Sequence, residues 1–199
     1  MTNRIPLKKV VNIHCEGDSE EIYINALVQD KYKGIKPKFK PKLRGTLQKL
    51  MNDIEDDISE LEPELPVYHF CILDMDTLHR QGLMTKYNEI KTRLCDKSEK
   101  LTFIESMPCL EFWFLLHFTY MNRYMANCKD AIAELDKADR LAGYTKNKKY
   151  QAQLYPKLRD KTDTAINNAK KSAHQLSLEH KLSYSMMHCF FEKMDDIVK

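Results

Sequence analysis

Three short motifs supply five acidic residues that could act as metal ligands. The first motif runs from Cys15 to Glu20, the second is Leu73-Asp74-Met75-Asp76 and the third is Pro108-Cys109-Leu110-Glu111. Carboxylate oxygens are the ligands that Mg²⁺ and Mn²⁺ prefer. Like charges gathered in one place repel one another unless a cation bridges them. The motifs therefore predict a Mg²⁺ or Mn²⁺ site with these ligands: Glu16, Glu20, Asp74, Asp76 and Glu111.

Each acid taken alone has an ordinary alternative as a helix cap or a solvated carboxylate. Glu20, for example, is favourable near a helix N-terminus without any metal, and an Asp-x-Asp pair is a weak signal by itself. The combination is more specific because each motif follows a segment that can form a strand. The sequence therefore favours a shared site over separate caps.

The strands that would position these acids are short apolar runs. Val67 to Leu73 is an almost unbroken run of β-forming residues, which is typical of a strand buried on both faces of a parallel sheet. Lys9 to Cys15 and Leu101 to Ile104 predict two further strands. The carboxyl ends of parallel strands face the ligand crevice of an open α/β sheet. Glu16, Asp74 and Asp76 should therefore meet at that edge.

Helical patterns alternate with these runs. Asp18 is expected to cap a helix that runs to about Val28, with Glu21 in the capping-box position. Lys36 to Leu43 contains Pro37 and Pro41, so it predicts an edge strand or an extended loop. The remaining helices are a Thr46-capped stripe from Leu47 to Leu61 ended by Pro63 and Pro66, a stripe from Leu83 to Leu94, and a buried helix from Cys109 to Phe118.

The fold prediction is an α/β domain over residues 1–120, with a parallel sheet of about four strands flanked by helices. After Tyr120 no strand is predicted. Asn127 should cap a short helix, Thr162 to Ala173 should form a polar helix, and a last helix should open at Tyr184 or Ser185. Residues 121–199 are thus expected to form a helical extension packed on the same domain.

Composition favours a soluble globular protein. Hydrophobic residues make up 43% of the 199 residues and charged residues 31%, and the net charge is +3. No apolar run is long enough for a membrane helix, and the N-terminus lacks the core of a signal peptide, so we predict a cytoplasmic protein with no membrane partner. The six cysteines lack metal-ligand spacing, which favours small buried thiols over a zinc site.

Basic residues are concentrated in two regions that could contact a phosphate backbone. Lys31 to Arg44 carries seven Lys or Arg and no acid, and Lys137 to Lys171 carries ten against three acids. The candidate nucleic-acid-binding residues are Lys38, Lys40, Lys42 and Lys146. The alternative for each basic run is an ordinary solvated face.

The order of these motifs resembles the Toprim fold, which has a Glu after its first strand and an Asp-x-Asp after its third. The segment from Glu16 to Glu20 is similar to the Glu-Gly-x-Thr-Glu of the OLD class of Toprim nucleases, and within that group the chain most resembles the RloB family. The marks of that resemblance are Cys15 to Gly17, Asp74 to Asp76, Ser106 to Phe118, the pair Tyr144 and Lys146, and Ser-Tyr-Ser-Met-Met-His in the last helix. One departure is Met75-Asp76-Thr77, where the family more often has Arg-Asp followed by Asp or His.

The resemblance implies metal-dependent phosphodiester hydrolysis of RNA or DNA, with Glu16, Asp74 and Asp76 as catalytic residues. One or two cations would bind the aspartates, and Glu16 could be a ligand or a general acid or base. The resemblance also implies an ABC-type ATPase partner in antiphage defence. The alternatives are a non-catalytic module that docks on the ATPase, and an enzyme that acts on nucleotides or joins strands. Trp113 and His117 are interpreted as packing residues.

Overall fold

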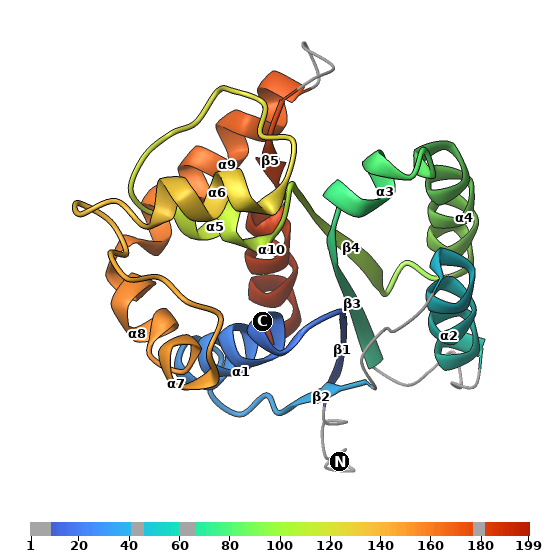
Figure 1. Ribbon diagram of the computed structural model, residues 1–199. Helices are drawn as coiled ribbons and strands as arrows, with labels where there is room; N and C mark the ends of the chain where they lie inside the picture. The colour runs from blue at the N-terminus through green and yellow to red at the C-terminus, as the bar shows by residue number, and fades with distance from the viewer. Residues whose placement is uncertain (1–8, 41–45, 60–66, 177–181) are drawn as a thin grey trace, which may run out of the picture.

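A computed structural model describes residues 9–40, 46–59, 67–176 and 182–199. Its described part contains a five-stranded sheet with the order β2-β1-β3-β4-β5 (Figure 1). The strands are β1 (Val10–Cys15), β2 (Pro37–Phe39), β3 (Val67–Asp74), β4 (Leu101–Met107) and β5 (Tyr184–Ser185). The pairings among β1 to β4 are parallel, and β5 runs antiparallel to β4. The predicted α/β class is confirmed, with β2 as the expected edge strand.

Helices cover both faces of the sheet, as the apolar run of β3 requires (Figure 1). On one face, Phe70 of β3 packs in a core with Trp113 and Phe190. On the other face, Leu73 of β3 packs in a separate core with Tyr87. The first face is covered by α1 (Asp18–Lys31), α5 (Leu110–Leu116) and α10 (Met187–Val198), and the second by α2 (Leu47–Ser59) and α4 (Met84–Lys97).

The second half of the chain packs on the first core. Its remaining helices are α6 (Cys128–Leu135), α7 (Lys148–Gln151), α8 (Leu154–Leu158), the short 3-10 helix Arg159–Lys161 and α9 (Thr162–Leu176). Asn168 of α9 donates a hydrogen bond of 2.8 Å to the Leu116 carbonyl oxygen at the end of α5. Tyr155 of α8 donates to a carboxylate oxygen of Asp30 in α1 at 3.1 Å. None of the described helices is long and apolar enough to cross a bilayer.

Two sequence predictions for the second half are wrong, namely that no strand follows Tyr120 and that the last helix begins at Tyr184 or Ser185. Tyr184 and Ser185 do not open the last helix but form strand β5, so a strand does exist after Tyr120. The pairing is held by the Met186 N–H, which donates to the Glu105 carbonyl oxygen at 2.8 Å. A two-residue strand has no periodicity to detect, and it forms because β4 offers an unpaired edge. Helix α10 begins at Met187.

Helix termini follow the predictions in part. Asn127 caps α6 with its side chain accepting from the N–H groups of Lys129 and Asp130, and the Thr46 hydroxyl accepts from the Lys49 N–H at 3.3 Å. The predicted Asp18 cap is wrong, because Gly17 occupies the N-cap position of α1 and makes no side-chain hydrogen bond there. At its other end α1 continues past the predicted Val28 to Lys31. The helix end predicted at Pro63 and Pro66 lies outside the described residues.

Candidate metal centre

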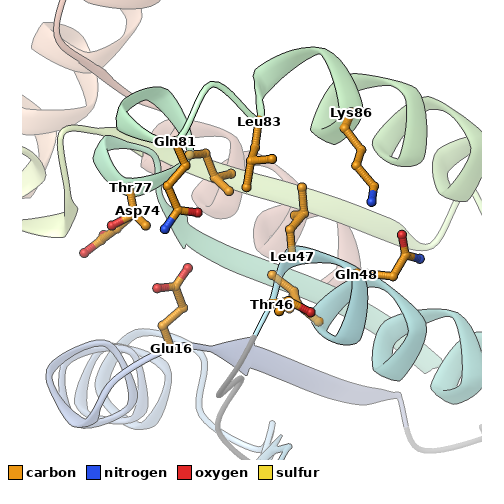
Figure 2. Close-up of a pocket in the computed structure, with 11 residues that line it drawn as sticks. Glu16, Thr46, Leu47, Gln48, Asp74, Thr77, Gln81, Leu83 and Lys86 are labelled. Carbon is orange, nitrogen blue, oxygen red and sulfur yellow. The ribbon is translucent and has the colours of Figure 1, made fainter.

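The predicted acids lie at the carboxyl ends of the parallel strands, on four elements and on the turn that follows β1. Glu16 follows β1, and Glu20 lies in the first turn of α1. Asp74 ends β3, and Asp76 begins the short helix α3 (Asp76–Arg80). Glu111 lies in the first turn of α5, which follows β4. Figure 2 shows the Glu16 side chain extending from the end of β1 toward the Asp74 side chain.

Both aspartates accept hydrogen bonds from the segments that follow in the chain. The Leu110 N–H donates to Asp74 Oδ1 at 2.9 Å, so the start of α5 is fixed against the end of β3. The Cys128 N–H donates to Asp76 Oδ2 at 3.4 Å, and the Thr77 hydroxyl donates to the other oxygen at 3.2 Å. These bonds orient the Asp-x-Asp pair from the N-terminal ends of two helices.

The Glu20 carboxylate folds back over Gly17, which explains why a glycine follows Glu16. A Cβ atom at position 17 would lie 2.5 Å from Glu20 Oε2, closer than nonbonded atoms approach. The Glu20 residue is only 6% exposed, and its Oε2 atom has no hydrogen-bond partner. A buried carboxylate oxygen without a partner is costly, so this atom is suited to a cation ligand.

Gly17→Ala is expected to displace the Glu20 carboxylate and to lower Mn²⁺ affinity by about tenfold, the lower end of what disturbed ligand positioning costs. The melting temperature should change little, because the backbone at Gly17 has φ −130° and ψ 172°, which alanine adopts freely. Titration calorimetry and a thermal melt of both proteins would check this. Unchanged Mn²⁺ affinity would show that Glu20 is not a ligand.

Glu111 differs from the other acids because the protein already compensates its charge. Its Oε1 atom accepts a hydrogen bond of 2.8 Å from the Tyr144 hydroxyl and lies 2.7 Å from Lys146 Nζ. The Gln151 side chain in turn donates to the Tyr144 hydroxyl at 3.2 Å. Sequence reasoning identified Lys146 but did not list Tyr144 as a site residue. The Tyr-x-Lys spacing was the available signal.

The pKa values of Glu16, Glu20 and Asp74 are all raised, which indicates that more negative charge gathers here than the protein compensates. Burial, then Glu20, then Asp76 raise the pKa of Glu16 from 4.5 to about 7, although the residue remains open to solvent on one side. Burial is also the largest cause of the raised pKa values of Glu20 and Asp74, followed by neighbouring carboxylates. For Glu20, backbone amides and Lys146 offset part of this rise. A divalent cation would lower all three pKa values.

The raised pKa of Glu16 predicts a pH dependence of stability. Between pH 4.5 and about pH 7 the folded protein keeps a proton that the unfolded chain loses, so this group makes stability fall as pH rises. The melting temperature in chelator should therefore decline more steeply with pH in the wild type than in Glu16→Gln. The difference between the two curves cancels the contribution of His14, whose lowered pKa acts in the opposite direction. If the melting temperatures of the two proteins changed in parallel with pH, the raised pKa assigned to Glu16 would be wrong.

The donor set fits a hard cation, although the carboxylates do not converge tightly. Within the described ranges, one set of three possible ligands has its ligand atoms within 4.8 Å of one another, namely Cys109, Glu111 and Cys128. The predicted carboxylates instead lie close enough to raise one another's pKa values. The unpartnered Glu20 oxygen and the all-oxygen donors fit Mg²⁺ or Mn²⁺, with Glu16, Glu20, Asp74 and Asp76 as the holding residues.

Two cysteines beside this site form a disulfide, so the prediction that all six are thiols is wrong for Cys109 and Cys128. Cys71, Cys95 and Cys189 are thiols, as predicted, although of these three only Cys71 is fully buried. The Cys128 sulfur lies 3.0 Å from Glu111 Oε2, but a disulfide sulfur has no proton to donate, so this is a packing contact. While the disulfide is intact, the two sulfurs cannot serve as thiolate ligands.

Two pockets flank the acids. One of about 400 Å³ is lined by Glu16 and Asp74 and extends between α2 and the α3–α4 segment toward Lys86 (Figure 2). The other, of about 680 Å³, is lined by Asp76, with Arg80 and Lys129 among its other residues. The sequence did not predict a role for these three basic residues, Arg80, Lys86 and Lys129. Arg80 and Lys86 follow Asp76 within ten residues, which was the only signal.

The predicted nucleic-acid-binding lysines have different surroundings. Lys38 is exposed on edge strand β2, whereas Lys40 Nζ lies 2.7 Å from an Asp57 carboxylate oxygen. Lys42 lies outside the described residues. Lys146 is bound to Glu111 within the acidic site, while its side chain stays 48% exposed. Of the three lysines that the structure describes, Lys146 is the one in direct contact with a predicted metal ligand.

These features define a mixed α/β protein with a carboxylate site at the carboxyl edge of its parallel strands. Residues 11–194 match the family described as RloB-like protein, and the chain belongs to the RloB-like family. No curated protein and no solved structure matches the chain.

Proposed function

We propose that this protein is a Mg²⁺- or Mn²⁺-dependent nuclease that hydrolyses phosphodiester bonds of RNA or DNA. The observation that carries the proposal is the excess negative charge of Glu16, Glu20 and Asp74, which burial and mutual repulsion express as raised pKa values. A protein that keeps such charges together at a sheet edge gains from a bound cation. The resemblance to Toprim nucleases and the family membership point to the same chemistry.

The side chains divide the work in a simple way. A bound divalent cation would polarise the phosphate and lower the pKa of a water molecule. Asp74 and Asp76 would hold the cation, oriented by the Leu110 and Cys128 N–H groups. Glu16, with a pKa of about 7, is suited to accept or donate a proton near neutral pH. Arg80, Lys86 and Lys129 line the flanking pockets, where they would bind neighbouring phosphates.

The resemblance also supports an ABC-type ATPase partner and a role in antiphage defence. The alternative is a docking subunit of that ATPase without catalysis. One observation favours the alternative, because Lys146 already neutralises Glu111 and so reduces the need for a cation there. In the nuclease, Lys146 would have to share Glu111 with the metal or turn its exposed end toward the substrate.

A cleavage assay tests the proposal. Labelled tRNA, single-stranded DNA and duplex DNA are incubated with the protein in Mg²⁺, in Mn²⁺ and in chelator, with and without the neighbouring ATPase. We expect metal-dependent cleavage of at least one substrate and none in chelator. If no substrate is cut with the ATPase present, while the protein still binds the ATPase, the docking alternative replaces the nuclease.

A further inference from the structure

The Cys109–Cys128 disulfide connects the two helices whose N-termini hold the aspartates. It joins the residue before α5 to the first residue of α6, across 19 positions, with Cα atoms 5.5 Å apart. Residues 119–127, the connection that it closes, contain neither helix nor strand. Cys71, Cys95 and Cys189 are not part of a disulfide. The one cross-link among the described residues therefore lies beside the predicted metal ligands, at the carboxyl ends of the parallel strands, here called the acidic edge.

Each half of this bridge is next to a hydrogen bond to an aspartate. Leu110, directly after Cys109, donates its N–H to Asp74, and Cys128 donates its own N–H to Asp76. The first bond is short, at 2.9 Å, and belongs to a fully buried helix. The second is longer, at 3.4 Å, and its donor residue is only half-buried. The covalent link to α5 therefore adds to the packing of Ala131 and Leu135 in fixing the position of the Cys128 N–H.

The bridge is accessible from one side only. Cys109 is fully buried, whereas Cys128 lines the pocket of about 680 Å³ together with His79, Arg80 and Lys129. An attacking thiolate can therefore reach the Cys128 sulfur, and the Cys109 sulfur is the leaving group. The basic residues around this pocket favour a thiol that carries carboxylates. Lys146 Nζ lies 3.9 Å from the Cys128 sulfur, where it offsets the charge of the Glu111 carboxylate, whose Oε2 atom lies 3.0 Å from the same sulfur.

We propose that Cys109 and Cys128 form a thiol–disulfide switch that controls the metal affinity of the acidic site, with a small anionic thiol as reductant. The first thiolate forms a mixed disulfide with Cys128 and releases Cys109, which takes up a proton. A second thiolate attacks the mixed disulfide and leaves with the first as a disulfide, and Cys128 takes up a proton. Two thiols are oxidised and one protein disulfide is reduced.

Reduction weakens the site in two ways. The start of α6 loses its covalent link to α5, so the N–H that orients Asp76 is held less firmly, by the packing and capping of α6 alone. The new Cys128 thiol can also donate to Glu111 Oε2, which now lies 3.0 Å from that sulfur. This inference rests on the proposed function only in assuming that the acids bind a metal. The reduced protein is the low-affinity form.

The test compares oxidised and glutathione-reduced protein by Mn²⁺ titration calorimetry and by amide hydrogen exchange of residues 126–131. Alkylation before and after reduction, read by mass spectrometry, establishes which cysteines are paired. We expect Mn²⁺ affinity to fall about tenfold on reduction, as when a group that orients a ligand is lost. Cys128→Ser should have the low affinity in both conditions. Cys95→Ser, which removes a half-buried free cysteine on α4, should behave as wild type.

The outcomes separate this inference from the proposed function. Equal Mn²⁺ affinity in oxidised and reduced protein overturns the switch and leaves the metal site intact. Absence of Mn²⁺ binding in both forms overturns the metal site, and the switch of metal affinity is overturned with it. Identical hydrogen exchange of residues 126–131 before and after reduction also overturns the switch, without any bearing on the metal site. Alkylation of both Cys109 and Cys128 before reduction also overturns the switch.

Discussion

Glu16→Gln is expected to slow nucleic-acid cleavage at least about 100-fold, the lower end of what a general acid or base contributes. Glutamine has the same shape but cannot carry the negative charge that holds a cation or accepts a proton. The residue is open to solvent, so the exchange costs no packing. It also removes a charge that Glu20 and Asp76 repel, so the melting temperature should stay the same or rise.

His117→Gln is the matched control for that result. His117 is 1% exposed, and its Nδ1 atom lies 3.0 Å from the Trp113 carbonyl oxygen within α5. Both His117 and Trp113 are buried, as expected of packing residues, although His117 Nε2 has no hydrogen-bond partner. The control should lower the melting temperature and leave the cleavage rate per folded molecule unchanged. A stable Glu16→Gln protein that cleaves at the wild-type rate would mean that Glu16 takes no part in the reaction.

The double substitution Asp74→Asn and Asp76→Asn is expected to lower Mn²⁺ affinity by more than about 100-fold. Loss of a group that only orients a ligand costs about 10- to 100-fold, and here two charged ligands are replaced. Asparagine keeps an oxygen that can accept from the Leu110 N–H, which now bonds to Asp74 at 2.9 Å, so the link to α5 should survive. The loss of mutual repulsion should again preserve or raise stability.

Titration calorimetry with Mn²⁺ measures this effect, and circular dichroism checks the fold. Asp160→Asn is the control, because that side chain is 90% exposed and lies outside the acidic edge. It should leave affinity unchanged. If the double mutant binds Mn²⁺ as tightly as the wild type, the aspartates are not ligands, and Glu111 with its neighbours becomes the better candidate.

The sequence by itself determined the central strands and the edge at which the acids lie. Val67 to Leu73 is apolar on both faces because α1, α5 and α10 cover one side of β3 while α2 and α4 cover the other. Glu16, Asp74 and Asp76 follow their strands directly, so parallel topology alone places them at one edge. The Asn127 cap was predictable because its hydrogen bonds involve residues only two and three positions further along the chain. These features depend on residues close together in the sequence, so the sequence alone is enough to predict them.

Only the tertiary structure decided which residues far apart in the sequence compensate, cover or connect the acids. Lys146 and Tyr144 reach Glu111 because the segment that contains α6 and α7 packs against α5, and the Tyr-x-Lys spacing alone does not specify that contact. Strand β5 exists because β4 has a free edge, and the Cys109–Cys128 bond exists because α6 begins beside α5. Each of these depends on the relative positions of packed elements, which no local periodicity specifies.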